Sequence, residues 1–413
     1  MALERRCRFC GGALALSFAD LGMSPLSNAF LRAGQLDRME PFYPLHARVC
    51  EQCFLVQLEQ FAAPEALFGG EYAYFSSYAD SWLEHAAAYA EAMTGRFGLG
   101  AGSRVVEIAS NDGYLLQYFV QRGIPVLGIE PADNVAAAAE AKGVPTVRRF
   151  FGTATARELA ASGKQADLLV GNNVLAHVPD LNDFVAGLAV LLKPGGVITL
   201  EFPHLLRLMA EGQFDTIYHE HFSYFSFLAA ERVFAAHGLT LFDVERIPTH
   251  GGSLRVYGRH EADCAKRVAA SVPALRALER EAGLERAQTY AAFADRVQEA
   301  KRHLLRFLID ARDAGKRVAG YGAPAKGNTL LNYCGVRSDL LEYTVDRSPH
   351  KQGLYLPGTH IEISHPDRIA ATRPDYVLIL PWNLTGEIVA QMAHVRSWGG
   401  RFVVPIPRAR VLD

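Results

Sequence analysis

Apolar residues in the middle of the chain come in short runs of strand length, and the segments between these runs have apolar positions at helical spacing. This alternation predicts a parallel sheet that helices cover on both faces. An Ala-rich segment over 78–98 predicts a helix that leads into the series. The strands are expected over 103–110, 125–130, 166–171 and 196–201, and the helices between them over 114–121, 133–142 and 181–192.

The flanking parts of the chain have different patterns. Residues 239–259 predict two strands around a Gly-Gly turn, which would close the sheet as an antiparallel hairpin. A charged, Ala-rich helical region over about 262–315 precedes a second strand–loop–helix series, which begins at 317–322. We therefore expect an α/β protein with a small loop-and-hairpin module over 1–65, a Rossmann-like domain over 66–261 and a second Rossmann-like α/β domain over 262–413.

Composition and charge narrow the class of protein. The chain has 413 residues, of which half are hydrophobic, and its 42 Lys and Arg almost balance its 44 Asp and Glu. This balance argues against a nucleic-acid partner, which usually needs a clustered basic surface. The sequence has no apolar run of the roughly 18 residues that span a bilayer. The first residues also lack the apolar stretch of a signal peptide. We expect a cytoplasmic protein with no membrane partner.

Four of the six cysteines form two C-x-x-C pairs, Cys7 with Cys10 and Cys50 with Cys53. Two such turns supply the tetrahedral sulfur shell of a structural zinc ion. Redox-type motifs are the alternative, but thioredoxin-like motifs do not come as two matched knuckles. A four-sulfur site is closed, so Zn²⁺ would hold structure and take no part in catalysis.

The loop over 107–113, where the first predicted strand turns into the first helix, lies where an open α/β sheet binds a nucleotide-like ligand. It resembles the E/D-x-G-x-G-x-G loop of S-adenosylmethionine-dependent methyltransferases, with Glu107 first and Gly113 last. Ala109 and Asn111 stand where that motif has glycine. A dehydrogenase is the rival, but the phosphates of its cofactor need the missing glycines.

Two further features extend this cofactor site. Glu130 ends the second strand, where an acid can accept hydrogen bonds from ribose hydroxyls. Asn172, Asn173 and His177 follow the third strand. A surface acid and a packed histidine are the alternatives for Glu130 and His177.

The densest polar cluster lies over 216–226 and alternates titratable with aromatic groups. Histidine is the natural general base near neutral pH, and a carboxylate such as Glu220 can orient it. Tyr218 could donate to an oxyanion. His219 and His221 with Glu220 also suggest a metal site, but a third well-spaced ligand is absent from the sequence pattern. A purely structural cluster is the other alternative.

The second α/β series carries Gly320-x-Gly322 and Lys326 at a predicted strand–helix turn, which favours a diphosphate cradle. Asp346 ends the next strand. A Rossmann-like domain without a ligand is the alternative, since a lone G-x-G is a weak signal.

Together these motifs resemble the nucleotide-sugar C-methyltransferases, which place a branching methyl group on deoxysugars. The resemblance covers essentially the whole chain, through the two C-x-x-C pairs and the motifs over 72–77, 107–113, 172–177, 218–225, 320–329 and 351–360. It implies a zinc module, an S-adenosylmethionine-binding domain and a C-terminal α/β domain. It also implies removal of a proton from sugar carbon 3, next to a 4-keto group, and attack of this carbon on the methyl sulfonium.

The resemblance also assigns residues. His221 is expected to be the base, with Tyr218, Glu220, His177 and Tyr72 around the sugar. The expected cofactor-binding residues are Glu107, Ala109, Asn111, Gly113, Glu130, Asn172 and Asn173. The expected substrate-binding residues are Tyr72, Ser76, Tyr224, Tyr321, Lys326, Asn328, Asp346, Lys351 and His360. The partner would be a nucleotide-sugar substrate, and the enzyme a monomer or a weak homo-oligomer.

Three other functions remain open from the sequence. An O- or N-methyltransferase on the same sugars would need no keto group, because its acceptor already holds a lone pair. A methyltransferase that acts on RNA or protein would usually carry a basic, aromatic-rich face. A non-catalytic protein with two α/β domains would not bind S-adenosylmethionine.

Overall fold

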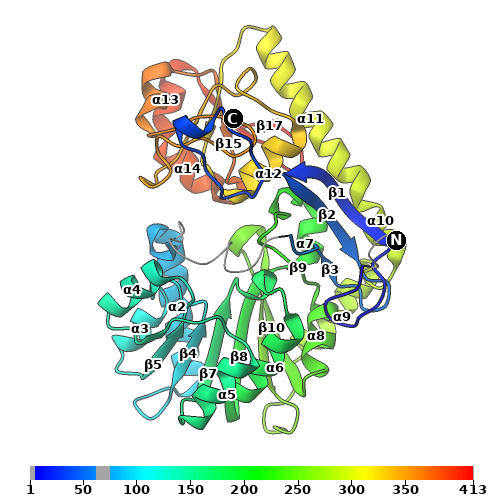
Figure 1. Ribbon diagram of the computed structural model, residues 1–413, viewed down its shortest axis with the longest axis vertical. Helices are drawn as coiled ribbons and strands as arrows, with labels where there is room; N and C mark the ends of the chain where they lie inside the picture. Colours follow the sequence, from blue (N-terminus) through cyan, green and yellow to red (C-terminus); the bar gives the residue numbers. More distant parts are fainter. Residues whose placement is uncertain (1–4, 62–74, 413) are drawn as a thin grey trace.

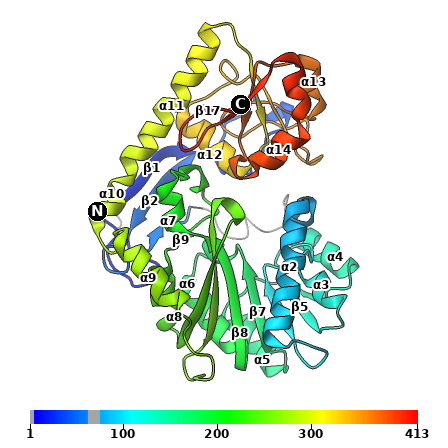
Figure 2. The same cartoon turned by 180° about the vertical axis from the view of Figure 1, so that it is seen from behind.

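The computed structural model describes residues 5–61 and 75–412, which form three sheets (Figure 1). A large sheet lies at one end of the molecule, a second α/β sheet at the other, and a small N-terminal sheet at the side between them. The long helix α11 (Phe293–Asp313) runs along this side, over the N-terminal strands, in both opposite views (Figure 2). The predicted α/β fold is confirmed.

The large sheet has seven strands in the order β10-β11-β8-β7-β4-β5-β6. The five strands from β8 to β6 are parallel, and β10 and β11 form the predicted antiparallel hairpin at one edge. The central strands are buried along nearly their whole length, as expected for a sheet that is covered on both faces. The strands are β4 (Val105–Ile108), β5 (Val126–Ile129), β6 (Thr146–Val147), β7 (Ala166–Asn172), β8 (Leu192–Pro203), β10 (Leu239–Ile247) and β11 (Ser253–His260).

The helices around this sheet include the four that the sequence predicts, α2, α3, α4 and α6. Helix α6 begins where the Asp180 side chain accepts a hydrogen bond from the Asp183 backbone N–H, a typical N-cap. Helices α5, α7 and α8 and the two-residue strand β6 were not predicted. The helices are α2 (Asp80–Phe97), α3 (Leu116–Val120), α4 (Asp133–Ala141), α5 (Thr153–Ala161), α6 (Leu181–Leu191), α7 (Leu205–Ala210) and α8 (Phe227–Ala235).

The C-terminal sheet has six strands in the order β14-β13-β12-β15-β16-β17, all parallel except the edge strand β17. The predicted strand at 317–322 is β12, the centre of this sheet. The strands are β12 (Val318–Tyr321), β13 (Thr344–Val345), β14 (Ile363–Ser364), β15 (Tyr376–Ile379), β16 (Arg401–Val404) and β17 (Arg410–Val411). The helices are α12 (Ala325–Cys334), α13 (Asp367–Thr372) and α14 (Thr385–Gln391), preceded by α9 (Ser271–Glu281) and α10 (Ala287–Ala291).

The N-terminal sheet consists of β1 (Leu16–Ser24), β2 (Tyr43–Val49), β3 (Val56–Gln57) and β9 (Ser223–Tyr224). Strand β9 comes from the polar cluster over 216–226, so the sheet is completed by a segment from the middle of the chain. The hairpin of β1 and β2 packs on the linker helices, where the Phe18 ring stacks on Phe293 with 4.6 Å between centroids. One hydrophobic core joins this module to the C-terminal domain.

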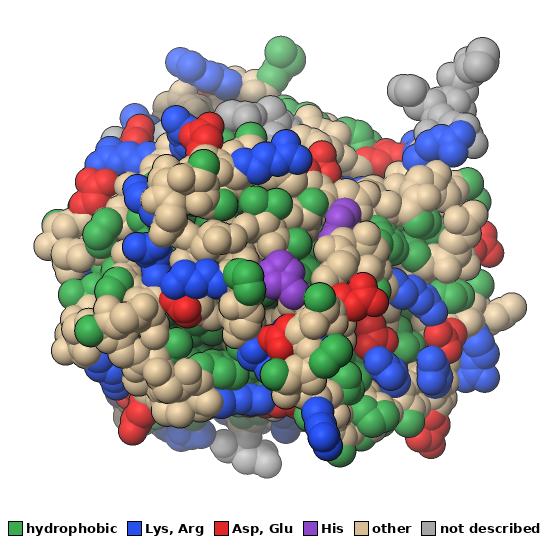
Figure 3. All heavy atoms as spheres, turned by 90° about the horizontal axis from the view of Figure 1, so that it is seen from below, with side chains coloured by type: hydrophobic (Ala, Val, Ile, Leu, Met, Phe, Trp, Pro, Cys, Tyr) green, Lys and Arg blue, Asp and Glu red, His purple; other side chains and the backbone are tan. Residues whose placement is uncertain are grey.

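Figure 3 shows one face of the molecule, on which basic and acidic side chains are interspersed. This face has no large patch of a single charge sign. Among the described helices, none is long and apolar enough to cross a membrane.

A buried carboxylate holds the large sheet to its neighbours. Glu279 of α9 is fully buried and accepts hydrogen bonds from the backbone N–H groups of Phe227 (2.6 Å) and Leu228 (2.9 Å) at the start of α8. The same carboxylate accepts from His204 Nε2 at 2.7 Å. His204 directly follows β8, so the Glu279 carboxylate connects α9 with the end of β8 and with the start of α8.

We expect Glu279→Ala to lower the free energy of unfolding by about 3–5 kcal/mol, because it leaves three buried donors without a partner. Chemical denaturation with the native fluorescence as signal measures this loss. Glu281→Ala on the same helix is the matched control, since Glu281 is exposed and should change stability by less than about 0.5 kcal/mol. Equal stability of both variants would contradict the role of Glu279.

Candidate active site

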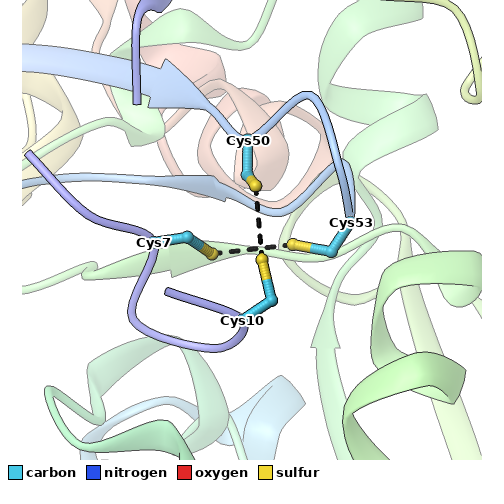
Figure 4. Close-up of side chains that lie close together, drawn as sticks. All are labelled: Cys7, Cys10, Cys50 and Cys53. Carbon is cyan, nitrogen blue, oxygen red and sulfur yellow. Dashed lines mark hydrogen bonds between the residues drawn. The ribbon is translucent and has the colours of Figure 1, made fainter. Parts of the chain in front are cut away.

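The four predicted cysteine ligands come together at one point. Their sulfur atoms all lie within 4.8 Å of one another. Cys7 Sγ is 3.6 Å from Cys53 Sγ, and Cys10 Sγ is 3.5 Å from Cys50 Sγ. Figure 4 shows the four side chains pointing at a common centre from two loops, one before β1 and one between β2 and β3.

These sulfur atoms fit a zinc ion. A tetrahedral shell with Zn–S bonds of about 2.3 Å has sulfur–sulfur edges of about 3.8 Å. A hydrogen bond with the Cys53 thiol lowers the pKa of Cys7, which favours the thiolate, the form that binds zinc. The site is formed by sulfur alone, which leaves no open position for a substrate.

The loop after β4 keeps a glycine-like backbone although two of its glycines are replaced. Ala109 has φ of 56° and Asn111 has φ of 49°, both in the left-handed region that glycine usually occupies, as Gly113 does at 74°. Asparagine tolerates this conformation better than most residues. The departures from the methyltransferase motif therefore leave the course of the loop intact.

Glu130, at the carboxyl end of β5, fixes this loop. Its Oε2 accepts from the Asn111 backbone N–H and its Oε1 from the Ala132 backbone N–H, both at 3.0 Å. Burial is the main influence on its carboxyl and raises its pKa. The carboxylate thus lies against the predicted cofactor loop, and its predicted role toward the ribose stays a prediction.

Polar groups for a ligand lie at the carboxyl ends of β4 and β7. Glu107 is fully buried, and this burial raises its pKa well above the usual range. The side-chain amide of Asn172 is buried, and both its oxygen and its nitrogen lack a partner among the described residues. A buried amide whose polar atoms have no partner among the described residues, beside a buried acid, fits a polar ligand such as S-adenosylmethionine.

Two aromatic residues that the sequence analysis did not select line this region. Asn173 Nδ2 donates to His250 Nε2 at 2.7 Å, and both residues have φ of 54°. The Trp82 ring meets the edge of His250 at 5.1 Å. His250 precedes the Gly-Gly turn of the hairpin and has a positive φ, which becomes visible only in the structure.

The two predicted histidines meet in the cluster over 216–226. The rings of His177 and His221 lie 4.6 Å apart between centroids, edge to face. His221 Nδ1 donates to the Thr216 carbonyl at 2.9 Å, so its Nε2 accepts the Tyr218 hydroxyl at 2.7 Å. These bonds fix the neutral tautomer and direct the basic nitrogen at the tyrosine.

Burial and the neighbouring His177 lower the pKa of His221 well below its usual value. Burial also lowers the pKa of His177 to about 4. Both rings are therefore neutral at physiological pH, which is the state that a general base needs.

Glu220 and His219 both contact the N-terminal module. Glu220 does not orient His221 as predicted, because the two ring nitrogens of His221 bond to Tyr218 and to the Thr216 carbonyl. Glu220 Oε1 accepts from Asn28 Nδ2 of the N-terminal module at 2.6 Å, and burial raises the pKa of Glu220 to about 7. His219 Nε2 donates to the Pro44 carbonyl at 3.2 Å, and its ring packs at 5.9 Å from Tyr43. The structure therefore separates His219 from the pair of His177 and His221.

Two further predicted residues flank the cluster. Tyr224 is buried in β9, with its ring 6.1 Å from that of His221. The Ser76 backbone N–H donates to Asn111 Oδ1 at 2.9 Å, which places Ser76 on the cofactor loop. Tyr72 lies outside the described residues.

The C-terminal domain brings Lys326 to the same region. Its Nζ donates to Asn383 Oδ1 at 2.7 Å and lies 4.5 Å from the centre of the Trp382 ring. Trp382 Nε1 donates to Asp215 Oδ2 at 2.7 Å. Burial lowers the pKa of Lys326 to about 8 and raises that of Asp215 to about 7, each opposed by the charge of the other residue. Asp215 was not selected from the sequence.

Asp346 and Lys351 also face the loop after β12. Asp346 Oδ2 accepts from the Ala323 N–H at 2.8 Å, and Lys351 Nζ donates to the Ala323 carbonyl at 3.0 Å. The structure therefore brings Lys326, Asp346 and Lys351 to one end of this sheet.

Three other predicted substrate-binding residues make contacts within the protein. Asn328 donates to the Ser27 carbonyl at 2.6 Å, and His360 donates to Glu40 at 3.2 Å. Both therefore tie the C-terminal domain to the N-terminal module. The Tyr321 hydroxyl donates to Gln391 Oε1 at 3.3 Å. Their predicted roles toward substrate stay predictions.

Comparison with known families covers most of the chain. Residues 7–68 match a putative zinc binding domain, residues 82–244 a methyltransferase domain and residues 248–407 the C-methyltransferase C-terminal domain. The fold and the sites thus define an S-adenosylmethionine-dependent methyltransferase with a four-cysteine zinc-binding module. The chain belongs to the C-methyltransferase family that combines these three domains.

A full-length relative is the C-methyltransferase NovU of Streptomyces niveus, which is 38% identical over 98% of this chain and 96% of its own length. The ubiquinone biosynthesis O-methyltransferase of Rhizobium etli (strain CIAT 652) is 36% identical, but over only 24% of this chain and 40% of its own length. The match to NovU confirms the predicted family.

Solved structures match part of the chain. One is magnesium protoporphyrin IX methyltransferase from Synechocystis with bound S-adenosylmethionine. The match covers 43% of this chain and 77% of that protein's chain, with 15% sequence identity and a TM-score of 0.32. Another is an S-adenosylmethionine-dependent methyltransferase from Mesorhizobium loti. This match covers 43% of this chain and the whole of that protein's chain, with 16% sequence identity and a TM-score of 0.34.

Metal analysis of the purified protein should find about one zinc per chain. We expect Cys50→Ser to lose this zinc and to lower hydrogen-exchange protection in the N-terminal sheet, including strand β9, because the metal holds both knuckles. Cys264→Ser is the control, since Cys264 is exposed and distant in sequence from the knuckles. A metal-free protein with full protection of this sheet would refute the zinc assignment.

Proposed function

We propose that this enzyme methylates carbon 3 of a 4-keto, nucleotide-linked deoxysugar through an enolate, with His221 as the base. The observation that carries the proposal is the fixed tautomer of His221, whose Nε2 faces Tyr218 while Nδ1 is bound to Thr216. A sugar carbon becomes a nucleophile only after it loses a proton. A buried, neutral imidazole is suited to remove it.

Tyr218 links the base to the oxygen of the substrate. Its hydroxyl donates to His221 Nε2, and we infer that it turns to the keto oxygen when the sugar binds. This turn frees the Nε2 lone pair to take the carbon-3 proton and gives the developing enolate oxygen a donor. Glu220, His177 and Tyr72 are proposed to lie around the sugar.

S-adenosylmethionine supplies the methyl group as an electrophile. Glu107 and Asn172 would hold its methionine part, because both are buried polar groups at the carboxyl edge of the sheet. Glu130 would accept from the ribose hydroxyls while it holds the loop that carries Ala109, Asn111 and Gly113. Asn173, on the same edge, would complete the pocket.

The C-terminal domain is proposed to bind the nucleotide part. Lys326 and Lys351 supply positive charge beside the loop after β12, and Asp346 holds that loop. The other residues proposed to bind the nucleotide sugar lie in the surrounding segments and are Ser76, Tyr224, Tyr321, Asn328 and His360.

The two domains together would orient the enolate against the methyl group. Such positioning can lower the activation free energy by roughly 7–11 kcal/mol.

One experiment separates this function from O- or N-methylation of the same sugars. The enzyme is incubated in deuterated water with a 4-keto nucleotide sugar and without the methyl donor. Carbon methylation requires removal of the carbon-3 proton, and reprotonation of the enolate without the methyl donor should replace this proton by deuterium. Transfer to oxygen or nitrogen needs no such step. Absence of exchange, together with methyl transfer to oxygen or nitrogen, would refute the proposal.

Glu130→Ala should weaken S-adenosylmethionine binding by about 1.5–3 kcal/mol, because it removes a charged acceptor for the ribose and the carboxylate that orders Asn111. Titration calorimetry measures this change. Asp133→Ala is the matched control, because the Asp133 side chain is 77% exposed. Unchanged affinity in Glu130→Ala would place the ribose elsewhere.

His221→Asn should lower turnover by roughly 10²–10⁴-fold, the usual contribution of a general base. The affinities for both substrates should stay nearly intact, because the loss falls on the transition state. His219→Asn is the control, and we expect a far smaller effect because His219 faces the N-terminal module. Near-normal turnover of His221→Asn would leave Tyr218 as the next candidate for the base.

The pH profile tests the same residue. Since the neutral imidazole is active and its pKa is lowered, the rate should rise with pH through a midpoint below 6.5. In His221→Asn this rise should disappear.

A further inference from the structure

Arg8 lies inside the first C-x-x-C pair, but its side chain leaves the zinc knuckle. The guanidinium donates through Nη1 to the Pro179 carbonyl at 2.7 Å and through Nη2 to the Leu58 carbonyl. It also lies over the Phe222 ring, 5.4 Å from its centroid. One side chain thus contacts three segments that are far apart in the sequence.

Two of these segments carry the histidines of the proposed active site. Pro179 follows the 3₁₀ helix η3 (Leu175–His177) by two residues, and Phe222 is the residue after His221. The backbone already ties the segments together, since the Phe222 N–H donates to the Ala176 carbonyl at 2.7 Å.

The third segment, which contains Leu58, bonds both to the His221 segment and to Arg8. The Leu58 N–H donates to the Phe222 carbonyl at 3.0 Å, and Leu58 in turn accepts from Arg8. Arg8 therefore spans the junction at which the strand from the zinc module meets both histidine-bearing segments.

The backbone of Arg8 is fixed to the zinc knuckle. Its N–H donates to Gln57 Oε1 at 2.8 Å, and Gln57 Nε2 donates to Cys7 Sγ at 3.1 Å. Asn182 Nδ2, from helix α6, donates to the Phe9 carbonyl at 2.9 Å. The position of the guanidinium is thus set by the cysteine shell on one side and by the large sheet on the other.

The shape of the arginine side chain matters here. Its planar fork directs two N–H donors at two carbonyls and presents a flat face to an aromatic ring. A lysine ammonium could reach one carbonyl at a time. An arginine side chain stays charged at neutral pH.

We propose that Arg8 is a positioning residue that sets the distance between His177 and His221, so that the zinc knuckle supports the proton-transfer step. The proposal rests on the proposed role of His221. Arg8 acts through Pro179 and Phe222 and does not touch the reacting atoms. An error of about 1 Å in such a geometry can cost on the order of 100-fold in rate.

Arg8→Met tests this role, because methionine keeps an apolar stem and removes both donors. We expect kcat to fall about 10- to 100-fold while KM for the nucleotide sugar and Kd for S-adenosylmethionine change less than about threefold. Zinc content should stay at about one per chain. Arg8→Lys should recover part of kcat, because it restores one of the two hydrogen bonds.

Arg6→Met is the matched control. Arg6 belongs to the same knuckle, is exposed and donates to the Gly11 carbonyl at 3.2 Å. Its replacement should leave kcat within about twofold of wild type. Nitrogen-15 imidazole spectra give a second readout without substrate: the signals of His177 and His221 should shift in Arg8→Met and not in Arg6→Met.

Wild-type kcat and unshifted imidazole signals in Arg8→Met would overturn the proposal. If Arg8→Met loses zinc, Arg8→Lys decides: reduced kcat with zinc retained supports the role, and wild-type kcat overturns it. If the wild-type enzyme catalyses no carbon-3 exchange and transfers the methyl group to oxygen or nitrogen, the proposed function fails. The imidazole spectra then still decide whether Arg8 positions the two rings.

Discussion

Strands β3 and β9 pair through only two residues each, with Val56 opposite Tyr224 and Gln57 opposite Ser223. The cysteine knuckle at Cys50 and Cys53 precedes β3, and the segment from Thr216 to His221 precedes β9. Buried backbone groups must find partners, so this antiparallel pair fixes the register between the two segments. The hydrogen bond from the Leu58 N–H to the Phe222 carbonyl continues this pairing, and Arg8 contacts both of these residues.

The two parallel sheets use the same device to shape their ligand loops. In the large sheet, Glu130 at the end of β5 accepts from the Asn111 N–H of the loop after β4. In the C-terminal sheet, Asp346 directly after β13 accepts from the Ala323 N–H of the loop after β12. In both cases an acid after a strand orders the loop that follows the neighbouring strand. This fits the general position of ligands at the carboxyl ends of parallel strands.

The sequence predicted the features that depend on local pattern. The alternation around β4 and β5 follows from periodicity, and the four cysteines follow from spacing. Asn28 could not be found this way, because it contacts Glu220 across 192 residues of chain. Strand β9 has two residues and therefore no periodicity. Asp215 and His250 acquire their surroundings only when the hairpin and the C-terminal domain pack against them, and the pattern of neighbouring residues carries no trace of that packing.

The completion of the N-terminal sheet by β9 has a consequence for biosynthesis. When the ribosome has released residues 5–61, the outer edge of β3 still lacks its partner, and an unpaired edge is a site for aggregation. Translation proceeds at about 5–20 residues per second, so on the order of ten seconds or more pass before Ser223 and Tyr224 emerge. Early capture of zinc by the cysteines would hold the nascent module together during this interval.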